Sequence, residues 1–299
     1  MVKVSIVMCC YNSERYIKET IDSVLNQTFE DFEFIIWNDG STDSTRSIIE
    51  SYSDPRIRLF SDINRGEGMA AQLACRKASG KYIARIDSDD VWLPQKLEDE
   101  YKYLENHPDV VMVSCPIIFI DRSGKELGVS FPVMNVSFLT KSIMRENRFV
   151  HSGSMYRTEI YKKTGGYCDI RLFQDWLLFR KMSEFGNLAL MPCPLIKYRL
   201  LPNSVAHRVE ESPYLPVILE FQKKIILEKG AVQEDIQMFN SLYQLIKKTN
   251  DDNKLIYTPT IQEKVYKILC NLLGNEISYR IVTCVVTLFH VCSLRNLCK

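Results

Sequence analysis

The sequence lacks any run of about eighteen consecutive apolar residues, which is the length that a membrane-spanning helix needs. Its most apolar late segment, residues 281–289, is too short to span a bilayer. The pattern favours a core helix there, with a helix that docks on a membrane surface or a partner as the alternative. Residues 1–5 lead directly into a predicted strand and show no signal-peptide pattern. We therefore expect a cytoplasmic protein, with peripheral contact at the inner face of the cytoplasmic membrane as a further option.

Cysteine motifs and a dominant charge are also missing. Ten cysteines are present, but none forms a CxxC pair or a Cys/His ligand spacing, which argues against a zinc site. Scattered single cysteines are typical of small core residues in a reducing compartment. The net charge of +1 supplies no field that would attract nucleic acid, so no nucleic-acid partner is expected. The 299 residues, 46% of them hydrophobic, suffice for a full core in one or two domains.

Apolar runs alternate with amphipathic segments through the first 90 residues. Strands are predicted at residues 4–10, 32–37, 56–60 and 82–86, with helices at 13–26, 44–53 and 69–79. This alternation predicts an α/β fold with a doubly wound, mostly parallel sheet flanked by helices. Further along, the pattern predicts helices at 95–106, 137–145, 158–164 and 173–185, strands at 110–115, 154–156 and 194–200, and a hairpin at 117–128. The remaining chain is predicted to form a helical C-terminal extension.

Three carboxylates stand at the end of the predicted strand 82–86. They are Asp87, Asp89 and Asp90. The carboxyl ends of parallel strands face the crevice in which open α/β sheets bind ligands. Because side chains alternate along an extended segment, Asp87 and Asp89 share one side and suit a hard divalent cation that binds phosphate. The alternative is that Asp89 or Asp90 caps the helix that starts near Pro94.

Two more acidic positions follow predicted strands or open helices. Asp39 stands at the end of the second strand, where it can accept a hydrogen bond from a ribose hydroxyl or a base N–H. The alternative is an Asx-turn at Asp39, and for Asp43 we favour a helix cap. Asp175 opens the helix 173–185, where its carboxylate is either a general base or a first-turn charge.

Four segments occur in an order and spacing that resembles the family-2 glycosyltransferases. They are residues 4–12, 26–29, 38–43 and 87–90. The resemblance is strong over residues 4–105, fair over 150–205 and absent beyond about 210. It implies the glycosyltransferase A fold, a nucleotide-diphosphate-sugar donor, a divalent metal (Mn²⁺ or Mg²⁺) and an inverting mechanism. The predicted domains are therefore a catalytic domain at 1–210 and a helical extension at 211–299 that contacts a membrane or a partner.

The resemblance also implies roles for individual residues on the donor side. Asp39 would contact the nucleoside, with Cys9 and Tyr11 packed around the base. Asp89 is the best candidate for the metal ligand. Asp87 or Asp90 would contact the sugar, the ribose or a metal-bound water.

On the acceptor side, Asp175 stands where the family carries its general base, although Gln174 replaces the Glu that usually precedes it. Segment 198–207 is similar to the family's Tyr-Arg segment, so Arg199 and His207 could reach the diphosphate or the metal, with His207 as a metal ligand. The alternative for Arg199 is an exposed ion pair. His151 is expected to line the acceptor side or to be structural.

The expected function is transfer of a sugar, most simply from a UDP-sugar, to a hydroxyl of a glycan or glycolipid acceptor. Polysaccharide, lipopolysaccharide or capsule synthesis is the usual setting for chains of this kind. One alternative is a non-catalytic scaffold that keeps the fold and binds a nucleotide. A weaker one is an NAD-dependent oxidoreductase, because residues 66–71 match G-x-G-x-x-A.

Overall fold

The computed structural model describes residues 2–130, 135–144, 147–170 and 173–201. These residues belong to one compact unit. The predicted extension at 211–299, its apolar segment and His207 lie outside the described residues. None of the described helices is long and apolar enough to span a membrane.

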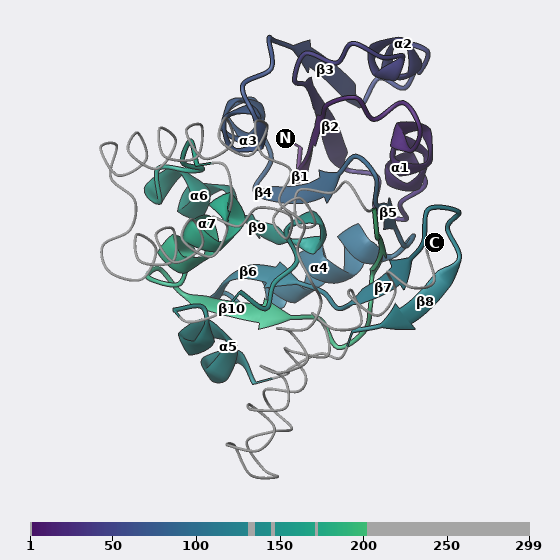
Figure 1. Ribbon diagram of the computed structural model, residues 1–299. Helices are drawn as coiled ribbons and strands as arrows, with labels where there is room; N and C mark the ends of the chain where they lie inside the picture. The colour runs from purple at the N-terminus through teal and green to yellow at the C-terminus, as the bar shows by residue number, and fades with distance from the viewer. Residues whose placement is uncertain (1, 131–134, 145–146, 171–172, 202–299) are drawn as a thin grey trace, which may run out of the picture. The chain divides into compact units, whose positions relative to one another are not determined.

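The central sheet has seven strands in the order β10-β6-β9-β4-β1-β2-β3 (Figure 1). The strands β1 (Val4–Cys10), β2 (Phe32–Asn38), β3 (Ile57–Ser61) and β4 (Tyr82–Asp87) are mutually parallel. The predicted doubly wound, mostly parallel sheet is therefore confirmed. The exception is β9 (Met155–Arg157), which runs antiparallel to β4 and to β6 (Val110–Ser114).

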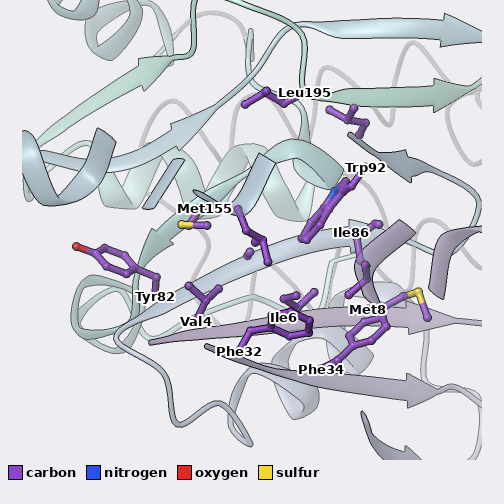
Figure 2. Close-up of a cluster of buried hydrophobic side chains, with 14 of the residues drawn as sticks. Val4, Ile6, Met8, Phe32, Phe34, Tyr82, Ile86, Trp92, Met155 and Leu195 are labelled. Atoms are coloured by element: carbon purple, nitrogen blue, oxygen red, sulfur yellow. The ribbon is translucent and has the colours of Figure 1, made fainter. Parts of the chain in front are cut away.

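Helices cover both faces of this sheet. One face packs against α1 (Ile17–Leu25), α2 (Thr45–Glu50) and α4 (Lys96–Asn106). The other face packs against α3 (Glu67–Cys75), α5 (Val136–Ser142), α6 (Thr158–Lys163) and α7 (Gln174–Met182). The side-chain alternation of β1 explains the split, because Ile6 and Met8 enter the first core and Val7 enters the second. Figure 2 shows the first core, in which Ile6 and Met8 of β1 lie beside Phe34 of β2.

A second, four-stranded sheet was not predicted as a separate layer. Its order is β5-β11-β7-β8, from β5 (Val91–Trp92), β11 (Ile196–Arg199), β7 (Ile117–Ile120) and β8 (Glu126–Val129). The predicted hairpin forms, since β7 and β8 are antiparallel neighbours. The two-residue β5 is too short to leave a pattern. The strand β10 (Asn187–Leu190) was also missed, because its Asn-Leu-Ala-Leu sequence contains no β-branched residue.

One local prediction is corrected, because the helix predicted at 13–26 begins only at Ile17 and has no side-chain cap. The residues before it bind other loops: the Asn12 Oδ1 accepts from the Thr42 N–H at 2.8 Å, and the Ser13 Oγ lies 2.7 Å from the Ser88 Oγ. These bonds tie the end of β1 to the loops after β2 and β4.

The described cysteines are free thiols. Cys10, Cys75 and Cys115 are buried, as predicted for core residues. Cys193 is exposed, and its position after β10 could not be inferred while that strand was missed.

Candidate active site

The ends of β1, β2 and β4 meet at one edge of the central sheet. In the strand register, Cys9 of β1 stands opposite Trp37 of β2 on one side and Asp87 of β4 on the other. Asp39 follows β2 directly. The structure therefore brings the first two predicted acidic positions to the same edge, where parallel α/β sheets bind ligands.

Asp39 is buried and holds the loop that precedes α3. Its Oδ1 accepts from the Arg65 N–H at 3.0 Å, and its Oδ2 accepts from the Gly66 N–H at 2.9 Å. Gly66 has a φ of +86°, which favours glycine at this start of α3. Each carboxylate oxygen retains a second lone pair that could accept a hydrogen bond from a nucleoside. The predicted nucleoside contact of Asp39 stays a prediction. Beside it, Cys9 is partly buried and Tyr11 is half-exposed.

The dinucleotide-binding interpretation of residues 66–71 is wrong. In that motif the backbone N–H groups at the start of the helix bind pyrophosphate, and a later glycine gives room for helix packing. Here the carboxylate of Asp39 already occupies the N–H groups of Arg65 and Gly66. The loop also follows the third strand of the chain rather than the first.

The acidic end of β4 lies among further charged groups. The His151 Nδ1 is 3.6 Å from the Glu67 Oε1 and 3.9 Å from the Asp87 Oδ1. One ligand atom from each of these three residues lies within 4.8 Å of the others. Burial raises the pKa of Asp87. Burial and the charge of Asp87 together raise the pKa of Asp89 to about 7.

Neither Asp89 nor Asp90 caps the following helix, so that alternative is wrong. The helix α4 begins at Lys96 and has no side-chain cap. Asp90 is instead buried, and its Oδ1 accepts from the backbone N–H of Arg199 at 2.9 Å. This bond joins residues 87–90, which we call the acidic turn, to β11 of the second sheet.

The buried side chain of Arg85 determines which ring nitrogen of His151 carries the proton. The Arg85 side chain is fully buried, and its Nε donates to the His151 Nε2 at 3.2 Å. A guanidinium can only donate, so the Nε2 accepts and the ring proton resides on Nδ1. The Tyr167 hydroxyl lies 2.6 Å from the same Nε2 and shares its single lone pair with Arg85. His151 therefore points an N–H at the carboxylates of Glu67 and Asp87.

This geometry tests the fit of a divalent cation. The carboxylates of Glu67, Asp87 and Asp89 are hard oxygen donors of the kind that Mg²⁺ and Mn²⁺ prefer. Crowded carboxylates repel one another, and a cation relieves that repulsion. His151 belongs to the compact cluster, but a protonated Nδ1 offers no lone pair to a metal. Among the described residues the compact cluster is Glu67, Asp87 and His151, and the predicted metal ligand Asp89 is not part of it. The two carboxylates of the cluster fit a hard cation, with His151 as a hydrogen-bond donor.

Asp175 occupies the first turn of α7, as predicted. Burial raises its pKa, and the charge of Glu67 adds to the effect. The preceding residues explain two local features. Phe173 has a φ of +60°, a left-handed conformation that costs a non-glycine residue of order 1 kcal/mol. Gln174 contributes to lowering the pKa of Glu67, where a glutamate would set two carboxylates against each other.

Arg199 has protein partners for its whole guanidinium. Its Nε donates to the Asp89 carbonyl at 2.8 Å, its Nη1 to the Asp121 carbonyl at 3.2 Å, and its Nη2 to Glu19. The side chain is buried rather than exposed, so the exposed ion pair is wrong. A direct contact with the donor would require Arg199 to leave these partners. His207, the other residue predicted from this segment, lies outside the described residues.

Sequence reasoning missed Glu67, Arg85 and Asn147 as site residues. Asn147 contacts Asp175 through its side-chain amide. A signal was available for Arg85, because a charge inside an apolar strand must be paired when it is buried. Nothing in the sequence marked Glu67 or Asn147, since both reach the site only through the tertiary fold.

The comparisons with known proteins agree with this architecture. Residues 5–165 match the family model of glycosyl transferase family 2. An uncharacterized glycosyltransferase of Haemophilus influenzae is 30% identical over 85% of this chain and 83% of its own length. The O-antigen biosynthesis glycosyltransferase WbnJ of Escherichia coli is 33% identical over 66% of this chain and 79% of its own length.

Two solved structures share the fold. S. aureus TarS 1-349 in complex with UDP-GlcNAc has a TM-score of 0.61 and 20% identity, covering 78% of this chain and 68% of that one. The mannosyltransferase PcManGT from Pyrobaculum calidifontis, in complex with GDP-Man and Mn²⁺, has a TM-score of 0.60 and 17% identity, covering 99% and 87%. At these identities the likeness concerns the glycosyltransferase A type of fold. With a family model that spans more than half of its length, this chain belongs to glycosyl transferase family 2.

Proposed function

We propose that this protein transfers a sugar from a UDP-sugar to a hydroxyl of a glycan or glycolipid, with inversion at the anomeric carbon. One observation carries the proposal: Asp175 belongs to the same electrostatic cluster as Asp87 and Glu67. Burial is the main cause of the raised pKa of Asp87 and of Asp175, and the charge of Asp175 adds to the first shift and that of Glu67 to the second. We infer that the candidate base and the candidate diphosphate site serve one substrate.

In this mechanism Asp175 takes the proton of the acceptor hydroxyl while that oxygen attacks the anomeric carbon. The bond from that carbon to the diphosphate oxygen breaks on the opposite face, so the configuration inverts. The raised pKa of Asp175 strengthens it as a base, but the group must be ionised to act. Asp39, Cys9 and Tyr11 would hold the nucleoside at the ends of β1 and β2.

A divalent cation at Asp87, Asp89 and Glu67 would neutralise the charge that grows on the leaving diphosphate. The Mn²⁺ of the PcManGT complex supports a metal in this fold, and the UDP-GlcNAc of the TarS complex supports a uridine donor. The Arg85 Nη2 and the His151 Nδ1 lie 3.7 and 3.9 Å from the Asp87 Oδ1 and attract its negative charge. Because Arg199 holds the acidic turn through the Asp89 carbonyl, we assign it support of that turn.

The acceptor assignment rests on relatives. WbnJ is named for O-antigen biosynthesis, and a chondroitin synthase of Escherichia coli is 32% identical over 61% of this chain and 27% of its own length. Both names describe assembly of a sugar polymer. We therefore propose polysaccharide, lipopolysaccharide or capsule synthesis at the inner face of the cytoplasmic membrane, with residues 211–299 as the contact to membrane or partner.

The test is a panel of nucleotide sugars with glycan and glycolipid acceptors, in which nucleotide release and product are measured together. The wild type should consume a UDP-sugar, and NMR of the product should show the inverted anomer. Asp175→Asn should lose at least about a hundredfold in transfer and keep donor binding. Undiminished transfer by Asp175→Asn would refute the base. Donor binding without turnover by the wild type would favour the non-catalytic scaffold.

A further inference from the structure

Asn147 has a side-chain amide that is fixed at both ends. Its Nδ2 donates to the Asp175 Oδ2 at 2.9 Å, and its Oδ1 accepts from the Phe149 N–H at 3.0 Å. Rotating the amide by half a turn would set its oxygen against a carboxylate and its NH₂ group against an N–H. The assigned orientation is therefore the one that satisfies both partners.

The chain around Asn147 is anchored to the helix that carries Asp175. Phe149 is buried, and its ring packs edge-on against Phe179 of α7 with centroids 6.2 Å apart. Val150 bonds Ser114 of β6 in both directions, with its N–H donating to the Ser114 Oγ at 3.2 Å and its carbonyl accepting from it at 3.0 Å. Asn147 and Asp175 thus keep their distance through packing as well as through their own hydrogen bond.

The hydrogen bond occupies one oxygen of the Asp175 carboxylate and leaves the other free of Asn147. A carboxylate with one oxygen held cannot rotate without breaking a charge-assisted bond. We propose that Asn147 is a positioning residue that orients Asp175, so that Oδ1 is the oxygen that takes the proton from the acceptor hydroxyl. This inference rests on the proposed function, because it assumes that Asp175 is the base.

The charged and titratable groups that act on Asp175 come from four other segments. They are Glu67 of α3, Asp87 at the end of β4, His151 of the 3₁₀ helix η1 (His151–Gly153), and Tyr167 after α6. Glu67 raises the pKa of Asp175, whereas His151 lowers it. Asn147 donates a hydrogen bond to the Asp175 carboxylate. Substituting Asn147 therefore changes the orientation of Asp175 without removing any of these charged groups.

Two variants of Asn147 separate charge from orientation. Asn147→Asp keeps the acceptor for the Phe149 N–H but turns a carboxylate oxygen toward Asp175. Two carboxylates at one site raise a pKa, so the acid limb of the rate profile should move up by about one pH unit or more. Asn147→Ala removes the bond without adding charge. We expect a kcat about tenfold lower even at the high-pH plateau, with the donor KM within about twofold of wild type.

The chain offers a matched control in a second Asn–Asp pair. The Asn187 Nδ2 donates to the Asp109 Oδ2 at the same 2.9 Å, in an exposed position at the start of β10. Asn187→Asp should leave kcat and the pH profile unchanged. Urea unfolding of each variant would show whether the Asn147 substitutions affect only stability.

The proposal is overturned if both Asn147 variants keep the wild-type kcat and pH profile, or if activity falls only in proportion to the folded fraction. Asp175→Asn separates this outcome from failure of the proposed function. If Asp175→Asn is inactive while both Asn147 variants are normal, the base stands and its orientation by Asn147 does not. If Asp175→Asn is fully active, both assignments are wrong.

Discussion

Carboxylates at the two ends of the central strands have opposite pKa shifts. At the amino end of the strands, Glu33 accepts from the Ser5 Oγ at 2.7 Å and pairs with Arg58. It also accepts from the Ser79 N–H at 2.8 Å and from the Ser79 Oγ at 2.6 Å. Burial alone would raise its pKa, but these hydrogen bonds lower it. At the carboxyl end, burial and the neighbouring Asp87 raise the pKa of Asp89 to about 7.

The difference separates a structural carboxylate from a functional one. Glu33 has all its hydrogen-bond donors within the protein, and they stabilise the charge that burial would otherwise penalise. Asp87 lies 3.7 Å from the Arg85 Nη2, but burial and the neighbouring carboxylates still raise the pKa of Asp87 and of Asp89. A group that is left unsatisfied in this way is available for a ligand, here a cation and the diphosphate that it would bind.

The largest expected effect is on transfer. Asp89→Ala should lower the rate of transfer by about a hundredfold or more, because charge on the leaving diphosphate loses its counterion. Glu33→Gln should leave the rate per folded molecule unchanged. Steady-state kinetics on both variants, corrected for the folded fraction, measure this difference. If Glu33→Gln lost as much transfer as Asp89→Ala, the distinction between a structural and a functional carboxylate would be wrong.

The next effect is on stability at the structural end. Glu33→Gln should lower the free energy of unfolding by about 1–3 kcal/mol, since it weakens charge-assisted hydrogen bonds. Because the folded pKa is lowered, this contribution is fully present above the unfolded pKa of about 4.3 and is lost as the pH falls through the folded value. Glu50→Gln, in the exposed pair with Arg46, serves as the control and should change stability by less than about 0.5 kcal/mol. Urea unfolding measures both variants.

A smaller effect of opposite sign is expected at the acidic end. With chelator present, Asp89→Asn should stabilise the protein at pH 8 by about 1 kcal/mol, because it removes a repelled charge, after allowance for solvent screening. The folded pKa lies near 7 and the unfolded one near 3.9, so the wild type is penalised at high pH. The advantage of Asp89→Asn should shrink as the pH falls from about 7 to about 4. A loss of stability at pH 8 would show that Asp89 is satisfied after all.

The smallest effect concerns the ring of His151. Nitrogen-15 NMR of histidine-labelled protein should show a protonated Nδ1 and an unprotonated Nε2 for this residue. His107 provides a reference, because its Nδ1 lies 2.8 Å from the Tyr103 carbonyl, which can only accept. His151→Asn should bind Mn²⁺ within about threefold of wild type, measured by calorimetry. An unprotonated Nδ1, or loss of Mn²⁺ binding, would make His151 a metal ligand.

The sequence was sufficient for the parts of the fold that local patterning determines. Buried strands such as β1 and β4 have continuous apolar runs, and Asp39, Asp87 and Asp175 follow or open predictable elements. Chain direction in β9 and the second sheet could not be predicted, since both depend on pairing between distant segments. Pairing also explains Asn147, whose partner lies 28 residues away in sequence. Periodicity describes one element at a time, whereas these contacts join several.

The central claim is that the acidic end of β4 binds a nucleotide diphosphate through a divalent cation. Calorimetry of UDP binding to the full chain at pH 8, with Mn²⁺ or with chelator, tests it most directly. The wild type should bind at least about tenfold more weakly with chelator, whereas Asp89→Asn should show no response to Mn²⁺. Equal binding of UDP by the wild type with and without Mn²⁺ would contradict the account.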